Sequence, residues 1–335
     1  MYELPIDTAT IKKIKGHQYY IFPKPGTHTN QKDRPQTYAN PKLLKTYKGA
    51  GSNNSAKLLP EVFDAAWQAT DAILASLPGV DFSALARHSR GLLGYEWSAY
   101  HRCNVVRAVR VGRALARARS RRVLDFGAYF GNFALMAATL GCEVDAVDSF
   151  GAYAPALDRA QALMRSRGVT VIDFAAAGFD LRERPPASYD AVLCLGVIEH
   201  IPHSPRGMLA AIDRVLKPGG TLVLDTPNLA YLYKRRALAE GRSIFPPIAD
   251  QFLTEPPFEG HHREFTIEEV RWMLQQLGHE SIAIETFDFS VYGLGSLEGD
   301  ALVNYREMQR HPELRELILA TSVKPGSAAA PSESD

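Results

Sequence analysis

The stretch VLDFGAYFGNFAL, Val123–Leu135, decides the fold of this chain of 335 residues. It opens with a short apolar run, typical of a buried strand, with Asp125 standing at its end. Gly127 and Gly131 then flank a tight turn, and an apolar helix follows over Asn132–Leu140. A strand, a glycine turn and a helix N-terminus leave unpaired backbone N–H groups beside an accessible backbone. The stretch therefore predicts a nucleotide-like ligand.

A second predicted strand, Glu143–Val147, ends in Asp148, about 20 residues after Gly127. An acid at this place can accept hydrogen bonds from ribose hydroxyls. The turn lacks the middle glycine of the G-x-G-x-x-G pattern, because Tyr129 stands in the loop, so nothing admits a pyrophosphate. A ligand with a ribose and no pyrophosphate fits better, and S-adenosylmethionine is the common one.

The rest of the chain continues to alternate strands and helices. A helix begins after Pro205, its apolar residues recur at helical spacing, and Lys217–Gly220 ends it. Further strands are predicted at 191–195, 221–225, 281–287 and 317–323. In this order the segments resemble the class I S-adenosylmethionine-dependent methyltransferases, in the branch that modifies small molecules, natural products or sugars. The matching motifs are LDFGAYFGNFA, the acid Asp148, YDAVLCLGVIEH, RVLKPGG and the TPN after Asp225.

The resemblance covers about residues 120–325 and implies an α/β fold. Its sheet is a doubly wound, seven-stranded, mostly parallel sheet of the Rossmann-like type, preceded by an N-terminal helical lid. Residues 1–60 hold ten Lys and Arg against three Asp and Glu, so we expect a basic irregular arm at the N-terminus. The predicted organisation is an arm (1–57), a helical lid (58–118), the methyltransferase domain (119–325) with an acceptor-pocket insertion (229–262), and a disordered tail (326–335).

The resemblance implies that the cofactor contacts the ends of the first four strands. For the adenine amino group, Asp180 with Leu181 is preferred over Asp173, because its distance from Asp190 is similar to the family's spacing. Tyr129 either lies over the methionine end of the cofactor or packs against the following helix. The predicted cofactor residues are Asp125, Gly127, Ala128, Tyr129, Gly131, Asp148, Ser149, Asp180, Leu181, Leu195 and Gly196.

Glu199 and His200 directly follow the fourth strand, at the carboxyl edge where ligands bind in open sheets. Imidazole has a pKa suited to taking a proton from a hydroxyl, so His200 is the predicted general base, with His203 second. Glu199 and His262 complete the predicted catalytic set. The alternative is that Glu199 and His262 only brace two loops by hydrogen bonds.

Glu199, His200 and one of His261 and His262 are also similar to the metal sites of small-RNA 2′-O-methyltransferases and of some quinol O-methyltransferases. The small-RNA enzymes carry another acid three residues before the glutamate. Gly196 stands at that position in this chain, so we predict no bound metal.

The helix over Trp97–Leu115 carries arginines at spacings of three and four, namely Arg107, Arg110, Arg113 and Arg117. Valines fill its other side, as in an ordinary amphipathic helix, so we predict that the arginines face solvent. The alternative is a site for phosphate or carboxylate groups, which suit arginine forks. Another helix is predicted over Leu59–Leu77.

Composition limits the functions that remain. The net charge of +1 provides no overall field for nucleic acid or a membrane surface, and no apolar stretch of about 18 residues occurs. The three cysteines are isolated, which indicates a reducing, cytoplasmic compartment. We predict a methyltransferase of the EC 2.1.1 type that methylates an oxygen of a small metabolite, such as a natural product, sugar or quinol. N-methylation, a non-catalytic partner of a biosynthetic complex, and a homodimer stay open.

Overall fold

The computed structural model describes residues 55–326 except 88, 93, 175–179 and 291–298, so most of the predicted arm and tail lies outside it. Seven strands form one sheet in the order β3-β2-β1-β4-β5-β7-β6. Only β7 runs antiparallel to its neighbours, which confirms the predicted fold class. The strands are β1 Arg122–Phe126, β2 Glu143–Asp148, β3 Thr170–Asp173, β4 Tyr189–Leu195, β5 Leu216–Pro227, β6 Glu280–Phe287 and β7 Leu317–Val323.

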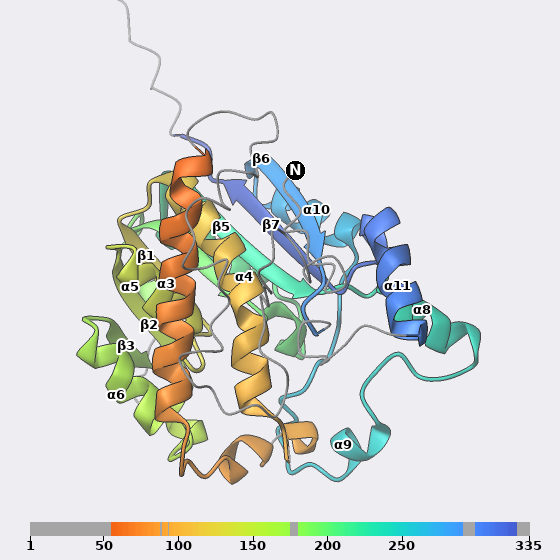
Figure 1. Ribbon diagram of the computed structural model, residues 1–335. Helices are drawn as coiled ribbons and strands as arrows, with labels where there is room; N and C mark the ends of the chain where they lie inside the picture. Colours follow the sequence, from red (N-terminus) through yellow and green to blue (C-terminus); the bar gives the residue numbers. More distant parts are fainter. Residues whose placement is uncertain (1–54, 88, 93, 175–179, 291–298, 327–335) are drawn as a thin grey trace, which may run out of the picture.

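Helices cover both faces of the sheet (Figure 1). Alternate side chains of a strand point to opposite faces, so Val123 of β1 packs with one helix layer and Leu124 with the other. The first layer contains α3 Ser55–Ser76, α4 Trp97–Ala118, α5 Asn132–Thr139 and α6 Asp158–Ser166. The second layer contains α7 Arg206–Val215 and α10 Ile267–Gln276.

The two helices predicted before the first strand are present as α3 and α4. Their apolar faces share one hydrophobic core with the sheet and α5, in which Ile73 and Val109 pack with Met136. A Cβ at Gly112 of α4 would lie 2.8 Å from Val62 Cγ1 of α3, so this glycine lets the two helices approach closely. Both helices therefore belong to the layer that buries the first face of the sheet.

Further helices follow β5 in the chain, namely α8 Leu232–Ala239, α9 Ile248–Phe252 and α11 Gly299–Arg310. Short 3₁₀ turns precede β5, among them η4 Phe150–Tyr153, η5 Leu181–Glu183 and η6 Ile198–His200. Leu232 of α8 packs against Met308 of α11, and the Arg236 guanidinium lies 2.7 Å from the Glu307 carboxylate. In the described part of the chain, no helix combines the length and apolar character needed to cross a bilayer.

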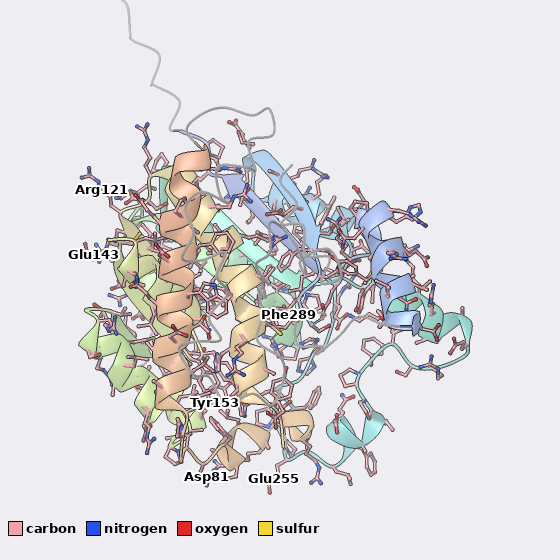
Figure 2. All side chains as sticks on the ribbon, viewed as in Figure 1. Asp81, Arg121, Glu143, Tyr153, Glu255 and Phe289 are labelled. Carbon is pink, nitrogen blue, oxygen red and sulfur yellow. The ribbon has the colours of Figure 1, made fainter. Side chains whose placement is uncertain are left out.

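The connections after β1 and β4 leave toward opposite faces, through α5 and α7, although these strands are neighbours. Ligands of open α/β sheets bind where such connections diverge, at the carboxyl ends of the strands. Figure 2 shows Arg121 and Glu143 at the edge where β1 and β2 begin, and Tyr153 at the opposite edge. The site described next lies at the edge marked by Tyr153.

Candidate active site

The loop between β1 and α5 contains three residues with a left-handed backbone: Gly127 with φ 82°, Tyr129 with φ 49° and Gly131 with φ 79°. A Cβ at Gly127 would lie 2.4 Å from Val197 Cγ2, in the turn after β4. Glycine is therefore required at 127 both by conformation and by space. The Gly127 N–H donates to the Val147 carbonyl at 2.9 Å, which ties the loop to β2.

Asp148 ends β2 and holds this loop. Its Oδ2 accepts the Tyr129 N–H at 2.7 Å, and its Oδ1 accepts the Ser149 N–H at 2.7 Å. Burial raises the pKa of Asp148 to about 6, although both hydrogen bonds act in the opposite direction. A carboxylate oxygen has two lone pairs, so Asp148 can accept hydroxyl hydrogens while it keeps both backbone contacts.

Three other predicted cofactor residues lie at the same edge of the sheet. Asp125 of β1 is fully buried, and this burial raises its pKa to about 7, with a further contribution from the Asp148 carboxylate. Leu195 ends β4, and Gly196 follows with φ 67° and donates its N–H to the Asp225 carbonyl at 3.1 Å. The structure thus brings the ends of β1, β2 and β4 together, as the sequence predicts.

The two acids considered for the adenine contact, Asp180 and Asp173, both accept hydrogen bonds from protein groups. Asp180 is the N-cap of η5, and its carboxylate accepts hydrogen bonds from the backbone and the guanidinium of Arg182. Leu181 is buried under the second face of the sheet. Asp173 ends β3 beside Asp148, and its Oδ2 accepts the Gly151 N–H at 2.9 Å. The assignment of Asp180 to adenine stays a prediction.

Tyr129 packs in an aromatic cluster that joins the glycine loop to α4 and η4. Its ring centroid lies 5.9 Å from Trp97, 4.7 Å from Phe130 and 5.7 Å from Tyr153. Left-handed backbone at a non-glycine residue costs about 1 kcal/mol, and these contacts together with the Asp148 hydrogen bond offset the cost. These ring contacts are with α4, the loop and η4 and not with the following helix α5, and the alternative contact with the methionine end of the cofactor stays a prediction.

Glu199 and His200 lie in η6, directly after β4, and His261 comes from the segment before α10. One ligand atom from each of these three residues lies within 4.8 Å of the others. The His200 and His261 ring centroids are 4.8 Å apart. The structure therefore places two histidines and one carboxylate at the carboxyl end of β4.

Hydrogen bonds orient both imidazoles. His200 Nδ1 lies 2.7 Å from the Glu259 carbonyl oxygen, so Nδ1 carries the proton, and His261 Nδ1 lies 3.0 Å from Glu264 Oε1. Burial lowers the pKa of His200 and lowers that of His261 to about 3, so both rings are neutral near pH 7. With Nδ1 used in this way, each ring presents the lone pair of Nε2.

Glu199 is buried between these rings and β5. Its Oε2 accepts a hydrogen bond from the Thr226 hydroxyl at 3.1 Å, and burial raises its pKa to about 8. The structure brings the ring of His261, and not that of the predicted His262, to the Glu199 carboxylate. His262 Nε2 is bonded to the Phe258 carbonyl at 3.0 Å, and its backbone N–H to the Glu199 carbonyl at 2.8 Å. His203, the second candidate base, is exposed.

Arg107 of α4 is buried, and the predicted solvent exposure is wrong at this position. Its Nε and Nη2 donate to Asp225 Oδ2 at 3.0 Å and Oδ1 at 2.7 Å, a bidentate ion pair. The two side chains are 9% and 1% exposed. Asp225 is a fully buried carboxylate within β5, and it needs a cation to offset its desolvation.

Asp225 and Glu264 are residues of this site that the sequence did not predict. Asp225 pairs with Arg107, for which binding of a carboxylate was the predicted alternative role. Glu264 orients His261 and forms an ion pair with Lys234. An acid at the end of an apolar strand was the available signal for Asp225. For Glu264, the signal was an acid three residues after a histidine.

Comparison with known proteins agrees with this geometry. A family described as the methyltransferase domain matches residues 101–284, more than half of the chain, and the chain belongs to this family. The match confirms that the chain contains a methyltransferase domain, as the resemblance predicts.

Curated relatives include the ubiquinone biosynthesis O-methyltransferase of Burkholderia ambifaria, 35% identical over 133 residues, covering 40% of this chain and 55% of the relative. The enzyme of the same name from Xanthomonas campestris is 37% identical over 108 residues, covering 32% of this chain and 43% of the relative. The chain thus spans about half the length of the curated relatives it matches.

Solved structures with a related arrangement have low sequence identity. An S-adenosylmethionine-dependent methyltransferase from Archaeoglobus fulgidus has a TM-score of 0.44 at 18% identity, covering 66% of this chain and 94% of that chain. A methyltransferase from Mesorhizobium loti has a TM-score of 0.41 at 21% identity, covering 63% of this chain and 98% of that chain.

Proposed function

We propose that this protein methylates a hydroxyl oxygen of a small, quinol-like molecule, using S-adenosylmethionine. The names of the curated relatives support oxygen methylation and a quinol-like acceptor. The observation that carries the proposal is the neutral imidazole of His200, whose free Nε2 lies at the carboxyl end of β4 beside the glycine loop.

The edge of the sheet fits a cationic cofactor. Gly127 and Gly131 allow the left-handed backbone of the loop, and Asp148 has lone pairs for ribose hydroxyls. Asp225 is paired with Arg107, and the raised pKa values of Asp125 and Glu199 keep these two groups partly or largely protonated near neutral pH. S-adenosylmethionine supplies a methyl group activated by a sulfonium, and its positive charge would favour the ionised forms of these acids.

His200 is proposed as the group that receives the acceptor's proton. Its Nδ1–H bond to the Glu259 carbonyl fixes the tautomer, so Nε2 can accept a proton from a hydroxyl placed in line with the methyl group. Alignment of the reacting atoms at about 3–3.5 Å supplies a large part of the rate. The same Nε2, with His261 and Glu199, could instead hold a divalent ion, which would lower the pKa of a bound hydroxyl.

The test is methyl transfer from labelled S-adenosylmethionine to catechol and hydroquinone probes. His200→Gln should lower turnover by about 100-fold while the affinity for the cofactor is unchanged. His203→Gln is the matched control, because His203 is exposed and lies outside the cluster, and it should keep full turnover. Full activity of His200→Gln would remove this residue from the mechanism.

Nitrogen methylation and a non-catalytic role, the two alternative functions, are tested by separate measurements. Aniline in place of the phenolic probe separates nitrogen from oxygen methylation. Cofactor binding without transfer to any probe would support the non-catalytic partner. A cytoplasmic, biosynthetic role is part of the proposal, and the free thiols of Cys103, Cys142 and Cys194 support it.

A further inference from the structure

The turn Phe258–His262, between α9 and α10, is fastened to the end of β4. Its last residue, His262, donates its N–H to the Glu199 carbonyl at 2.8 Å, and the Glu259 carbonyl accepts the His200 Nδ1–H at 2.7 Å. His262 Nε2 lies 3.0 Å from the carbonyl oxygen of the turn's first residue, so the turn also closes on itself. The backbone on both sides of Glu259 is therefore held in place.

The side chain of Glu259 is directed toward the end of β2. The Tyr153 hydroxyl, in η4 after β2, donates a hydrogen bond to the Glu259 carboxylate. Burial is the main cause of the raised pKa of Asp148, and the Glu259 carboxylate adds to the rise, so the two acids interact through space. The turn is thus bound to the end of β4 through its backbone and to the end of β2 through one side chain.

The strand order places the glycine loop between these two attachments. β1 lies between β2 and β4 in the sheet. A turn held at the ends of β2 and β4 therefore spans the carboxyl end of β1, where the loop Gly127–Gly131 begins. Figure 2 shows Tyr153 at this edge, away from Arg121 at the other. The proposed cofactor would lie at this loop, with its ribose beside Asp148.

Asp148 and Glu259 lack a cation that would offset their charges. Among the described residues, no Lys or Arg forms an ion pair with either carboxylate. Each Asp148 oxygen accepts one backbone N–H, from Tyr129 or Ser149, and keeps one further lone pair. Hydroxyl donors from a ligand would stabilise both carboxylates in their ionised form. A ribose presents two such hydroxyls on adjacent carbons.

We propose that Glu259 binds a ribose hydroxyl of the cofactor together with Asp148, so that the turn Phe258–His262 encloses the bound cofactor. Glu259 is not among the cofactor residues that the sequence predicts. Its carbonyl also fixes the tautomer of His200, so one residue joins the cofactor to the proposed base. This inference rests on the proposed function, because it takes S-adenosylmethionine as the cofactor.

The first test is calorimetric binding of S-adenosylhomocysteine to the full-length protein. This ligand has the same ribose and no sulfonium charge, so its affinity reports on hydroxyl contacts and not on attraction of a cation. Glu259→Gln should weaken binding about tenfold, because an amide is a weaker acceptor than a carboxylate. Glu255→Gln, at an exposed position earlier in the same segment, is the matched control and should bind like the wild type.

The second test removes each hydroxyl from the ligand. Of the 2′-deoxy and 3′-deoxy forms of S-adenosylhomocysteine, one should cost the wild type about tenfold more affinity than it costs Glu259→Gln, because the variant has already lost that contact. Tyr153→Phe keeps the ring, removes the hydroxyl that holds Glu259, and should narrow the same difference. If Glu259→Gln does not fold, which circular dichroism reports, Tyr153→Phe decides.

The third test follows the turn itself by amide hydrogen exchange. The His262 N–H is bonded to Glu199, so its exchange reports on opening of the turn. With S-adenosylhomocysteine at about ten times its Kd, exchange in the wild type should slow about tenfold. Glu259→Gln, at about ten times its own Kd, should show no such slowing.

Wild-type affinity in Glu259→Gln, equal losses for the deoxy ligands in both proteins, or exchange at His262 that the ligand does not slow would each overturn the inference. Failure of the wild type to bind S-adenosylhomocysteine would refute the proposed function. Binding by the wild type that does not depend on Glu259 refutes only this inference.

Discussion

Replacing Arg107 with methionine should destabilise the protein by about 3–5 kcal/mol, the usual cost of leaving one partner of a buried ion pair unpaired. Asp225 is 0% exposed, and both of its oxygens take hydrogen bonds from Arg107. Methionine retains packing between the Phe133 and Phe289 rings, whose centroids lie 5.1 Å and 5.6 Å from the guanidinium carbon. The loss of stability therefore reports on the charge that remains on Asp225.

The assay is urea unfolding, with the free energy taken from the midpoint and slope. Arg107→Met with Asp225→Asn should recover at least half of the loss, which corresponds to a coupling energy of about 2 kcal/mol. Arg117→Met, at an exposed position of the same helix, should change stability by less than about 0.5 kcal/mol. A loss below about 1 kcal/mol for Arg107→Met, or additive effects in the double variant, would refute the reasoning.

Asp148→Asn should weaken cofactor binding. In the wild type, calorimetric affinity should fall about tenfold per pH unit below about 6, because protonated Asp148 loses lone pairs for ribose; a flat profile would contradict this role. Tyr129→Gly should lower the free energy of unfolding by about 2 kcal/mol despite relief of the left-handed backbone, whereas Tyr129→Phe should melt like the wild type. The folded-state pKa of Asp125, about 7, lies above its ordinary value of 3.8, so the cofactor-free protein should lose about 1.4 kcal/mol per pH unit as pH rises between these values. Asp125→Asn should reduce the slope of the unfolding free energy against pH by this amount, while Asp148 and Glu199, whose pKa values are also raised, keep their own contributions. An unchanged slope would show that Asp125 contributes nothing to it.

The sheet was predictable because its strands carry their own signals. The run Leu317–Val323 has the same bounds in the structure as in the sequence prediction, since its apolar residues are buried on both faces of the sheet. The strand after the Lys217–Gly220 turn begins earlier than predicted, because pairing includes Leu216 opposite Tyr189. Only contact with a neighbouring strand could reveal that extension.

The site was less predictable because its pairs are distant in sequence. Helical periodicity marked the polar side of α4, but it could not indicate that Arg107 meets a buried acid on β5. His261 and His262 are adjacent, so the backbone path through the insertion decides which ring turns toward Glu199. By contrast, the sequence could predict that Asp148 and Gly127 lie at one edge of the sheet, because they come at the carboxyl ends of two neighbouring parallel strands.

The shared core of α3, α4 and α5 sets a boundary for engineering. A protein cut before the first strand would expose the apolar surface of α5, including Phe133 and Met136, to water. Exchange of residues 55–118 between related enzymes would bring new aromatic side chains to the cofactor loop, since Trp97 contacts Tyr129. Chimaeras of this protein should therefore transfer the first two helices together with the matching face of α5, as one unit.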